Sequence, residues 1–199
     1  QIVAKYRNNE IKPVLFPSII FGVAKNYNYP YILIEVNDIG DSIGSMLNYD
    51  LEYPNVLMCA MRGRAGQVVG QGFSGNKTQL GVKMSITVKK QGCSNLKAII
   101  EEDKLTFCDF HILQELTTFI QRKQCWEADD GYHDDLVMCM VLFAWLVMQE
   151  YFKEMTDQDV RRRIYEEQRD QIEQDMAPFG FIDDGMGDDT FMDGDGDLW

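Results

Sequence analysis

Two continuous apolar runs dominate the hydrophobic pattern in the first third of the chain. Residues 31–34 and 56–60 consist almost wholly of apolar residues, including strand formers, which favours strands covered on both faces. A helix is expected between them, at residues 42–49. Strand, helix and strand at this spacing predict an α/β unit with a parallel strand pair.

Weaker patterns predict further elements on both sides of this unit. A segment with six glycines, residues 63–81, suggests an exposed hairpin or loop around residues 67–69. Asp109 is placed to cap the helix that follows it. Short strands are expected at 2–6, 105–107 and 125–126, and helices at 17–25, 84–102 (with Gly92 a weak point) and 110–122.

The most apolar stretch, residues 136–148, predicts a buried core helix, since a membrane span needs about 20 such residues. After residue 155 the composition becomes strongly polar. Residues 156–176 predict an exposed charged helix, and the Gly-Asp-rich residues 181–199 a flexible tail. We therefore expect a folded domain at 1–155 and an acidic helix with a tail at 156–199.

Charge is distributed unevenly along the chain. The net charge is −13, but residues 1–155 hold 15 basic against 18 acidic residues, so most of the acidity lies in the tail. No acidic residue occurs between Glu52 and Glu101, and this segment can carry a local positive field. Its basic residues are Arg62, Arg64, Lys77, Lys83, Lys89, Lys90 and Lys97.

Carboxylates are the side chains that suggest chemistry, because the five cysteines are scattered singly and form no CxxC pair. Glu35 follows the first apolar strand, at the kind of strand end where α/β proteins bind ligands. Asp134 and Asp135 open the core helix, where one can ligate a metal while the other caps the helix or supports the ligand. Glu127, Asp129 and Asp130 crowd this region with further negative charge, which Mg²⁺ or Mn²⁺ would relieve. Two such ions about 3.5–4 Å apart hydrolyse phosphodiesters in known nucleases.

Four short motifs carry a family resemblance. They are YILIEVN (31–37), LGVK (80–83), GCSNLK (92–97) and GYHDDLVM (131–138). In this order they resemble the nuclease domain of large terminase subunits of tailed bacteriophages, particularly the contractile-tailed branch. The likeness spans about residues 1–155.

The resemblance implies a ribonuclease-H-like α/β fold, with a central mixed sheet flanked by helices. It implies that Glu35 is the second catalytic carboxylate and that the third comes from Asp134 or Asp135, with Asp135 favoured. His133 would contact DNA or orient an aspartate, and the motif at 80–83 would face DNA. No residue matches the family's first catalytic aspartate, so we expect a fold lacking its first strand and an incomplete metal site. A GxxxxGK[ST] phosphate loop is also absent from the sequence.

The leading hypothesis is a metal-dependent endonuclease that cuts concatemeric double-stranded DNA with two Mg²⁺ or Mn²⁺ ions. DNA phosphates would be held by Arg62, Arg64, Lys77, Lys83, Lys89 and Lys90. The implied partners are an upstream ATPase domain, the portal and the small terminase subunit, with no membrane, in the host cytoplasm during virion assembly. Alternatives are a non-catalytic docking module on the same scaffold and a resolvase or integrase of the same fold.

Overall fold

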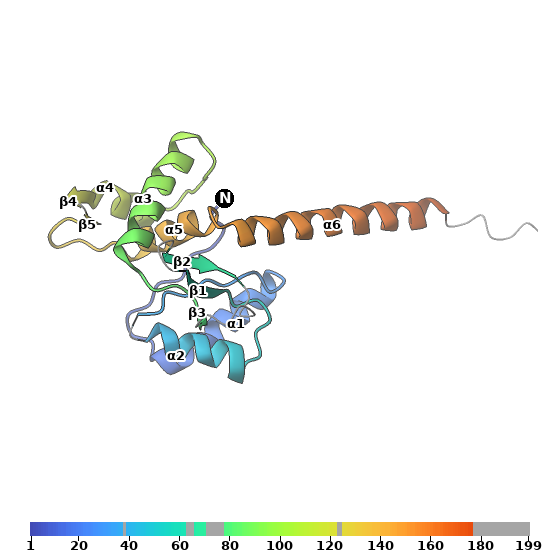
Figure 1. Ribbon diagram of the computed structural model, residues 1–199, viewed down its shortest axis with the longest axis horizontal. Coiled ribbons are helices and arrows are strands. Elements are labelled where there is room, and N and C mark those ends of the chain that lie inside the picture. The colour runs from blue at the N-terminus through green and yellow to red at the C-terminus, as the bar shows by residue number, and fades with distance from the viewer. Residues whose placement is uncertain (38, 63–65, 71–77, 123–124, 177–199) are drawn as a thin grey trace, which may run out of the picture. The chain divides into compact units, whose positions relative to one another are not determined.

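The computed structural model describes residues 1–37, 39–62, 66–70, 78–122 and 125–176 (Figure 1). The chain divides into two compact units, Gln1–Met155 and Thr156–Trp199. The elements of the first unit follow the order η1 (Pro13–Leu15), α1 (Phe16–Asn26), α2 (Gly40–Ser45), the π-helix η2 (Met46–Asp50), β1 (Met58–Arg62), β2 (Gly66–Val69), β3 (Thr78–Leu80), α3 (Ile86–Glu101), α4 (Phe110–Thr118), β4 (Phe119–Arg122), β5 (Cys125–Ala128) and α5 (Asp135–Leu146); α6 (Glu150–Met176) starts in this unit and continues into the second.

A mixed sheet forms the centre of the first unit. Strands β2, β1 and β3 pair antiparallel in that order. The segment at residues 31–36 joins this sheet through parallel bridges from Ile32 to Val56 and from Glu35 to Val82. The predicted parallel pairing is present, with α2 and η2 as the connection, but residues 31–36 pair through isolated bridges and form no strand, and β1 begins at Met58 and not at residue 56.

Helices cover both faces of the sheet. On one face, Leu57 and Val82 pack against Val88 of α3 and Trp145 of α5. On the other, Ile34 packs with residues of α1 and η2, including Leu47. This arrangement of layers agrees with the expected α/β fold (Figure 1).

Helices α3 and α5 pack together more extensively than any other pair of helices. Their contact is close at Gly92, because a β-carbon there would lie 2.7 Å from Cγ1 of Val141. Gly92, predicted as a weak point of α3, is therefore the residue that lets the two helices approach. The core position of α5 confirms the interpretation of the most apolar stretch, since Val137, Val141 and Trp145 are all buried.

The prediction of a helix at 110–122 places its C-terminal end too far along the chain. It ends at Thr118, and Phe119–Arg122 forms β4, antiparallel to β5. The Oγ1 atoms of Thr117 and Thr118 donate hydrogen bonds to the Gln114 carbonyl, which competes with continuation of the helix. The β-propensity of Phe119 and Ile120 and their pairing with β5 favour the strand.

The strands predicted at 2–6 and 105–107 are not strands in the structure. The two segments are joined by one backbone hydrogen bond, from Ile2 N–H to the Thr106 carbonyl at 2.9 Å. A single bond does not make a ladder, so both segments are extended coil.

In the second unit, the described residues belong to α6, and its side chains at 156–172 are mostly polar and exposed, which agrees with the prediction of an exposed charged helix. Arg162 pairs with Asp159 at 3.2 Å and with Glu166 at 4.0 Å. The predicted tail at 181–199 lies outside the described residues. Among the described residues no single helix is long and apolar enough to cross a membrane. Helices α5 and α6, which are bent relative to each other at a short break, are long and apolar enough only when taken together.

Candidate metal and nucleic-acid site

Glu35 lies at the end of the segment that joins the sheet beside Val82. The Val82 N–H donates to the Ile34 carbonyl and the Val36 N–H to the Val82 carbonyl, both at 2.8 Å. These two bonds fix the backbone on each side of Glu35. Its half-buried carboxylate accepts a hydrogen bond from the Asn37 side-chain amide at 2.5 Å.

The surroundings of Glu35 include one cation and one further carboxylate. Burial raises the pKa of Glu35, the charge of Lys89 lowers it and the charge of Asp134 raises it again. Lys89 belongs to α3, and Asp134 immediately precedes α5. The charge of Asp134 therefore acts on Glu35, almost a hundred residues away in sequence, at the end of a sheet segment.

Asp134 occupies the N-cap position of α5, but its side chain makes no capping hydrogen bond. The capping acceptor comes from α4 instead. Oε2 of Glu115 accepts from the N–H groups of Leu136 and Val137 at 2.7 and 3.2 Å. The idea that one of the adjacent aspartates caps this helix is therefore wrong for Asp134, whose carboxylate is left available.

Asp135 is the first residue of α5, and its side chain is 69% exposed. One of its oxygens lies 3.6 Å from a guanidinium nitrogen of Arg7. The pKa of the Cys139 thiol is raised by desolvation and, further, by the charges of Glu35, Asp135 and Glu115. The charges of these three carboxylates thus all act on one thiol in the first turns of α5.

Crowding of Glu127, Asp129 and Asp130 does not call for a metal ion. Arg122 lies 3.7, 2.7 and 3.0 Å from the carboxylates of these three residues, respectively. The pKa of Asp130 is lowered by this guanidinium. We predicted that a divalent cation would compensate the negative charge of these carboxylates. In the structure, Arg122 of β4 compensates it.

The predicted phosphate-binding residues are only partly described. Lys89 is half-buried, with its Nζ 6.0 Å from the centroid of the Phe119 ring, whereas Lys90 is exposed. Arg62 ends β1, and the structure describes its backbone alone. Arg64 and Lys77 lie outside the described residues.

Lys83 is the exposed member of the motif at 80–83 that was expected to face DNA. Leu80 and Val82 are buried in the core, so that expectation is wrong for those two side chains. Lys83 is held through its backbone, since its N–H donates to Oε1 of Gln67 at 2.7 Å and its carbonyl accepts from Nε2 at 2.5 Å. It directly follows the residue that bridges to Glu35, which places its backbone beside the candidate site.

His133 is exposed and lines a polar hollow of about 300 Å³. One wall of this hollow is formed by side chains on one face of α4, and the other by the loop that leads into α5. The residues that line it are Arg7, His111, Gln114, Glu115, Thr118, Gly131, Tyr132 and His133.

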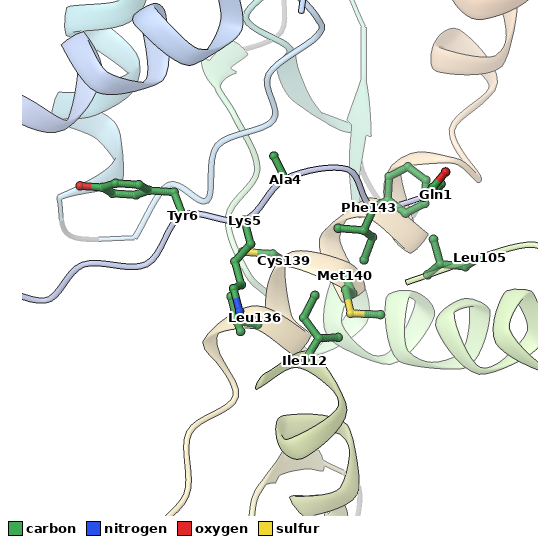
Figure 2. A pocket seen from close by; sticks show the side chains of 11 residues that line it. Gln1, Ala4, Lys5, Tyr6, Leu105, Ile112, Leu136, Cys139, Met140 and Phe143 are labelled. Carbon is green, nitrogen blue, oxygen red and sulfur yellow. The ribbon is translucent and has the colours of Figure 1, made fainter. Parts of the chain in front are cut away.

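A second hollow, of about 370 Å³, lies next to α5 and has a mainly apolar lining. Figure 2 shows Leu136, Cys139 and Met140 of α5 close to the extended N-terminal segment that carries Ala4 and Lys5. Its lining contains no carboxylate, so it is not a candidate metal site.

Sequence reasoning missed Glu115 and Arg7. Glu115 is 5% exposed and is the only charged residue classed as buried among the described residues. A signal existed, because Glu115 lies three residues after Ile112 and next to Leu116, and so falls on the face of the helix that these apolar residues share. A charged residue on such a face requires a partner in the interior.

A family model described as the terminase RNaseH-like domain matches residues 1–176. This match agrees with the layered α/β architecture and with the resemblance carried by the four motifs. The contractile-tailed branch stays a prediction. The chain belongs to the terminase RNaseH-like domain family, the nuclease-domain family of phage large terminases.

Proposed function

We propose that this domain cuts concatemeric double-stranded viral DNA by metal-dependent phosphodiester hydrolysis. The observation that carries the proposal is the match of residues 1–176 to the terminase RNaseH-like domain family, and the position of Glu35 at the end of a sheet segment, where the charge of Asp134 acts on it, supports the proposal. Burial of like charges raises the free energy of the ionised pair, and a divalent cation between them would lower it. Structural carboxylates are more often neutralised by a basic side chain, as Arg122 does for Asp129 and Asp130.

The donor set fits Mg²⁺ or Mn²⁺, which prefer carboxylate oxygens. Glu35 and Asp134 would hold the metal, with Asp135 close by on the first turn of α5. Among the described residues no group of three or more His, Cys, Asp or Glu side chains is close enough to enclose an ion. Water and phosphate oxygens of DNA would complete the coordination, which is usual for Mg²⁺. When bound, two such ions activate water and stabilise the leaving oxygen.

The chain's own residues would bind and orient the DNA backbone. Lys83 and Lys90 are exposed, and the charge of Lys89 acts on Glu35, so these three lysines would contact DNA phosphates. His133 is placed on the same loop as Asp134. Phosphate contacts give affinity without sequence preference, as cutting of concatemeric DNA requires.

The remaining phosphate contacts would come from Arg62, Arg64 and Lys77 in the segment free of acidic residues. We also propose that the domain works with an ATPase domain of the same protein, with the portal and with the small terminase subunit. This assembly would act in the host cytoplasm during virion assembly, without contact with a membrane.

The test is Mn²⁺-dependent cleavage of supercoiled plasmid by a form of the domain that also supplies the family's first catalytic aspartate, and by its Glu35→Gln, Asp134→Asn and Asp135→Asn variants. We expect cleavage by the unsubstituted form, its loss in Glu35→Gln and Asp134→Asn, and a lower rate in Asp135→Asn, whose carboxylate is next in sequence to Asp134. Asp130→Asn is the matched control, since Arg122 already neutralises this aspartate, and it should cut at the rate of the unsubstituted form. A folded unsubstituted form that binds the plasmid without cutting it in Mn²⁺ would instead support the non-catalytic docking module.

A further inference from the structure

Glu115 carries a buried charge that the proposed reaction does not itself require. It belongs to α4, and its Oε2 reaches the first backbone N–H groups of α5, 21 and 22 residues further along the chain. An N-cap residue normally supplies this acceptor from its own side chain. Here Asp134 has the N-cap position and the right side chain, yet does not cap.

The second oxygen of Glu115 links the cap to Asp135. Oε1 accepts a hydrogen bond from Nη1 of Arg7 at 3.4 Å, and Nη2 of the same arginine lies 3.6 Å from Asp135. Arg7 thereby compensates part of the charge on Glu115. Glu115 is thus linked to the start of α5 in two ways, directly to the N–H groups of Leu136 and Val137 and through Arg7 to Asp135.

We propose that Glu115 is a positioning residue that caps α5 from outside, so that Asp134 remains free to bind the metal with Glu35. This inference rests on the proposed function. Without Glu115, the N–H groups of Leu136 and Val137 lose their acceptor in the interior. Aspartate is a favoured N-cap residue, and Asp134 would turn back to cap its own helix. The cap and the metal would then compete for one carboxylate.

The expected effect is weaker metal binding. Loss of residues that orient metal ligands typically reduces metal affinity about 10- to 100-fold. We expect Glu115→Ala to lie in this range for Mn²⁺, measured by isothermal titration calorimetry on the complete chain. Ser85→Ala is a matched control, because it removes an N-cap hydrogen bond of 3.2 Å from α3 while leaving α5 intact. It should retain the wild-type Mn²⁺ affinity.

The hollow beside Glu115 permits a chemical rescue. Glu115 lines the polar hollow of about 300 Å³, so truncation to alanine opens room next to the free N–H groups. Acetate supplies the missing carboxylate. We expect acetate to restore Mn²⁺ affinity to Glu115→Ala several-fold, at constant ionic strength, and to leave the wild type unchanged. A role limited to general stability predicts no such recovery.

The outcomes separate this inference from the proposed function. A wild type that binds no Mn²⁺ overturns the proposed function. A wild type that binds Mn²⁺, together with a folded Glu115→Ala of equal affinity or one that acetate does not restore, overturns the inference alone. Should Glu115→Ala not fold, Glu115→Gln, which keeps the reach of the side chain, should bind Mn²⁺ more tightly than Glu115→Asp. Equal or reversed affinities of those two variants would also overturn the inference.

Discussion

Gly92 provides the sharpest test of how α3 and α5 pack. By helix propensity alone, replacing a glycine within a helix by alanine should stabilise the helix by about 1 kcal/mol. At this position, however, a β-carbon would meet the carbonyl oxygen of Val141, would lie 2.7 Å from its Cγ1 and would lie 3.2 Å from its carbonyl carbon. Backbone atoms cannot rotate away, so α3 and α5 must separate.

The magnitude follows from these two opposing terms. Overpacking costs about 1–3 kcal/mol, with the upper half expected where backbone is involved. After subtraction of the helix-propensity gain, Gly92→Ala should lower the free energy of unfolding by about 1–2 kcal/mol. For a unit of this size, that lowers Tm by about 3–6 °C.

Gly22→Ala is the matched control for this substitution. Gly22 also lies within a helix, α1, but nothing lies within 4 Å of its would-be β-carbon. This variant should gain about 0.5–1 kcal/mol. Urea unfolding of both variants measures the difference. Equal stabilisation by the two substitutions would refute the close approach of α3 to α5.

Three further predictions concern charges at the candidate site. Glu35→Gln should stabilise the metal-free chain at neutral pH. Burial raises the pKa of Glu35 in the folded state, so ionisation of Glu35 lowers the free energy of unfolding as the pH rises from the ordinary glutamate pKa through the raised one. Urea unfolding at acid and neutral pH should show this gain at neutral pH only, and a gain of equal size at acid pH would contradict it. Glu35→Gln should also lower the pKa of the Cys139 thiol and speed its reaction with a disulfide reagent, in a background in which Cys108 and Cys125 are serine; an unchanged rate would place Glu35 away from α5. Lys89→Met should raise the pKa of Glu35 further, since it removes the charge that lowers it, and NMR titration showing no rise would rule out their proximity.

Much of the fold follows from patterns that are local in the sequence. The apolar runs at 31–34 and 56–60 predict a parallel pair because buried strands need continuous apolar residues. The cap at Asp109 was also predictable, because the contact is local in sequence: the Asp109 side chain accepts a hydrogen bond from the Ile112 N–H at 3.0 Å. The end of α4 was not, because β4 exists through its pairing with β5.

The candidate site depends on contacts that local patterns do not contain. Glu35, Asp134 and Asp135 were identified from their positions at a strand end and a helix start. The acceptor that caps α5 comes from Glu115, in another helix, and no spacing rule connects residues on separate elements. The pairing of Arg122 with Asp129 depends likewise on the β4–β5 hairpin, which brings them to 2.7 Å.

The central claim is that Glu35 and Asp134 form one metal-binding pair, and the pKa of the Glu35 carboxyl tests it most directly. This pKa can be followed through the side-chain carboxyl carbon by NMR in the wild type and in Asp134→Asn, with and without Mg²⁺. We predict that Asp134→Asn lowers the pKa of Glu35, because the charge of Asp134 raises it in the wild type. We also predict that Mg²⁺ lowers it in the wild type. A Glu35 pKa that responds neither to the substitution nor to Mg²⁺ would contradict the account.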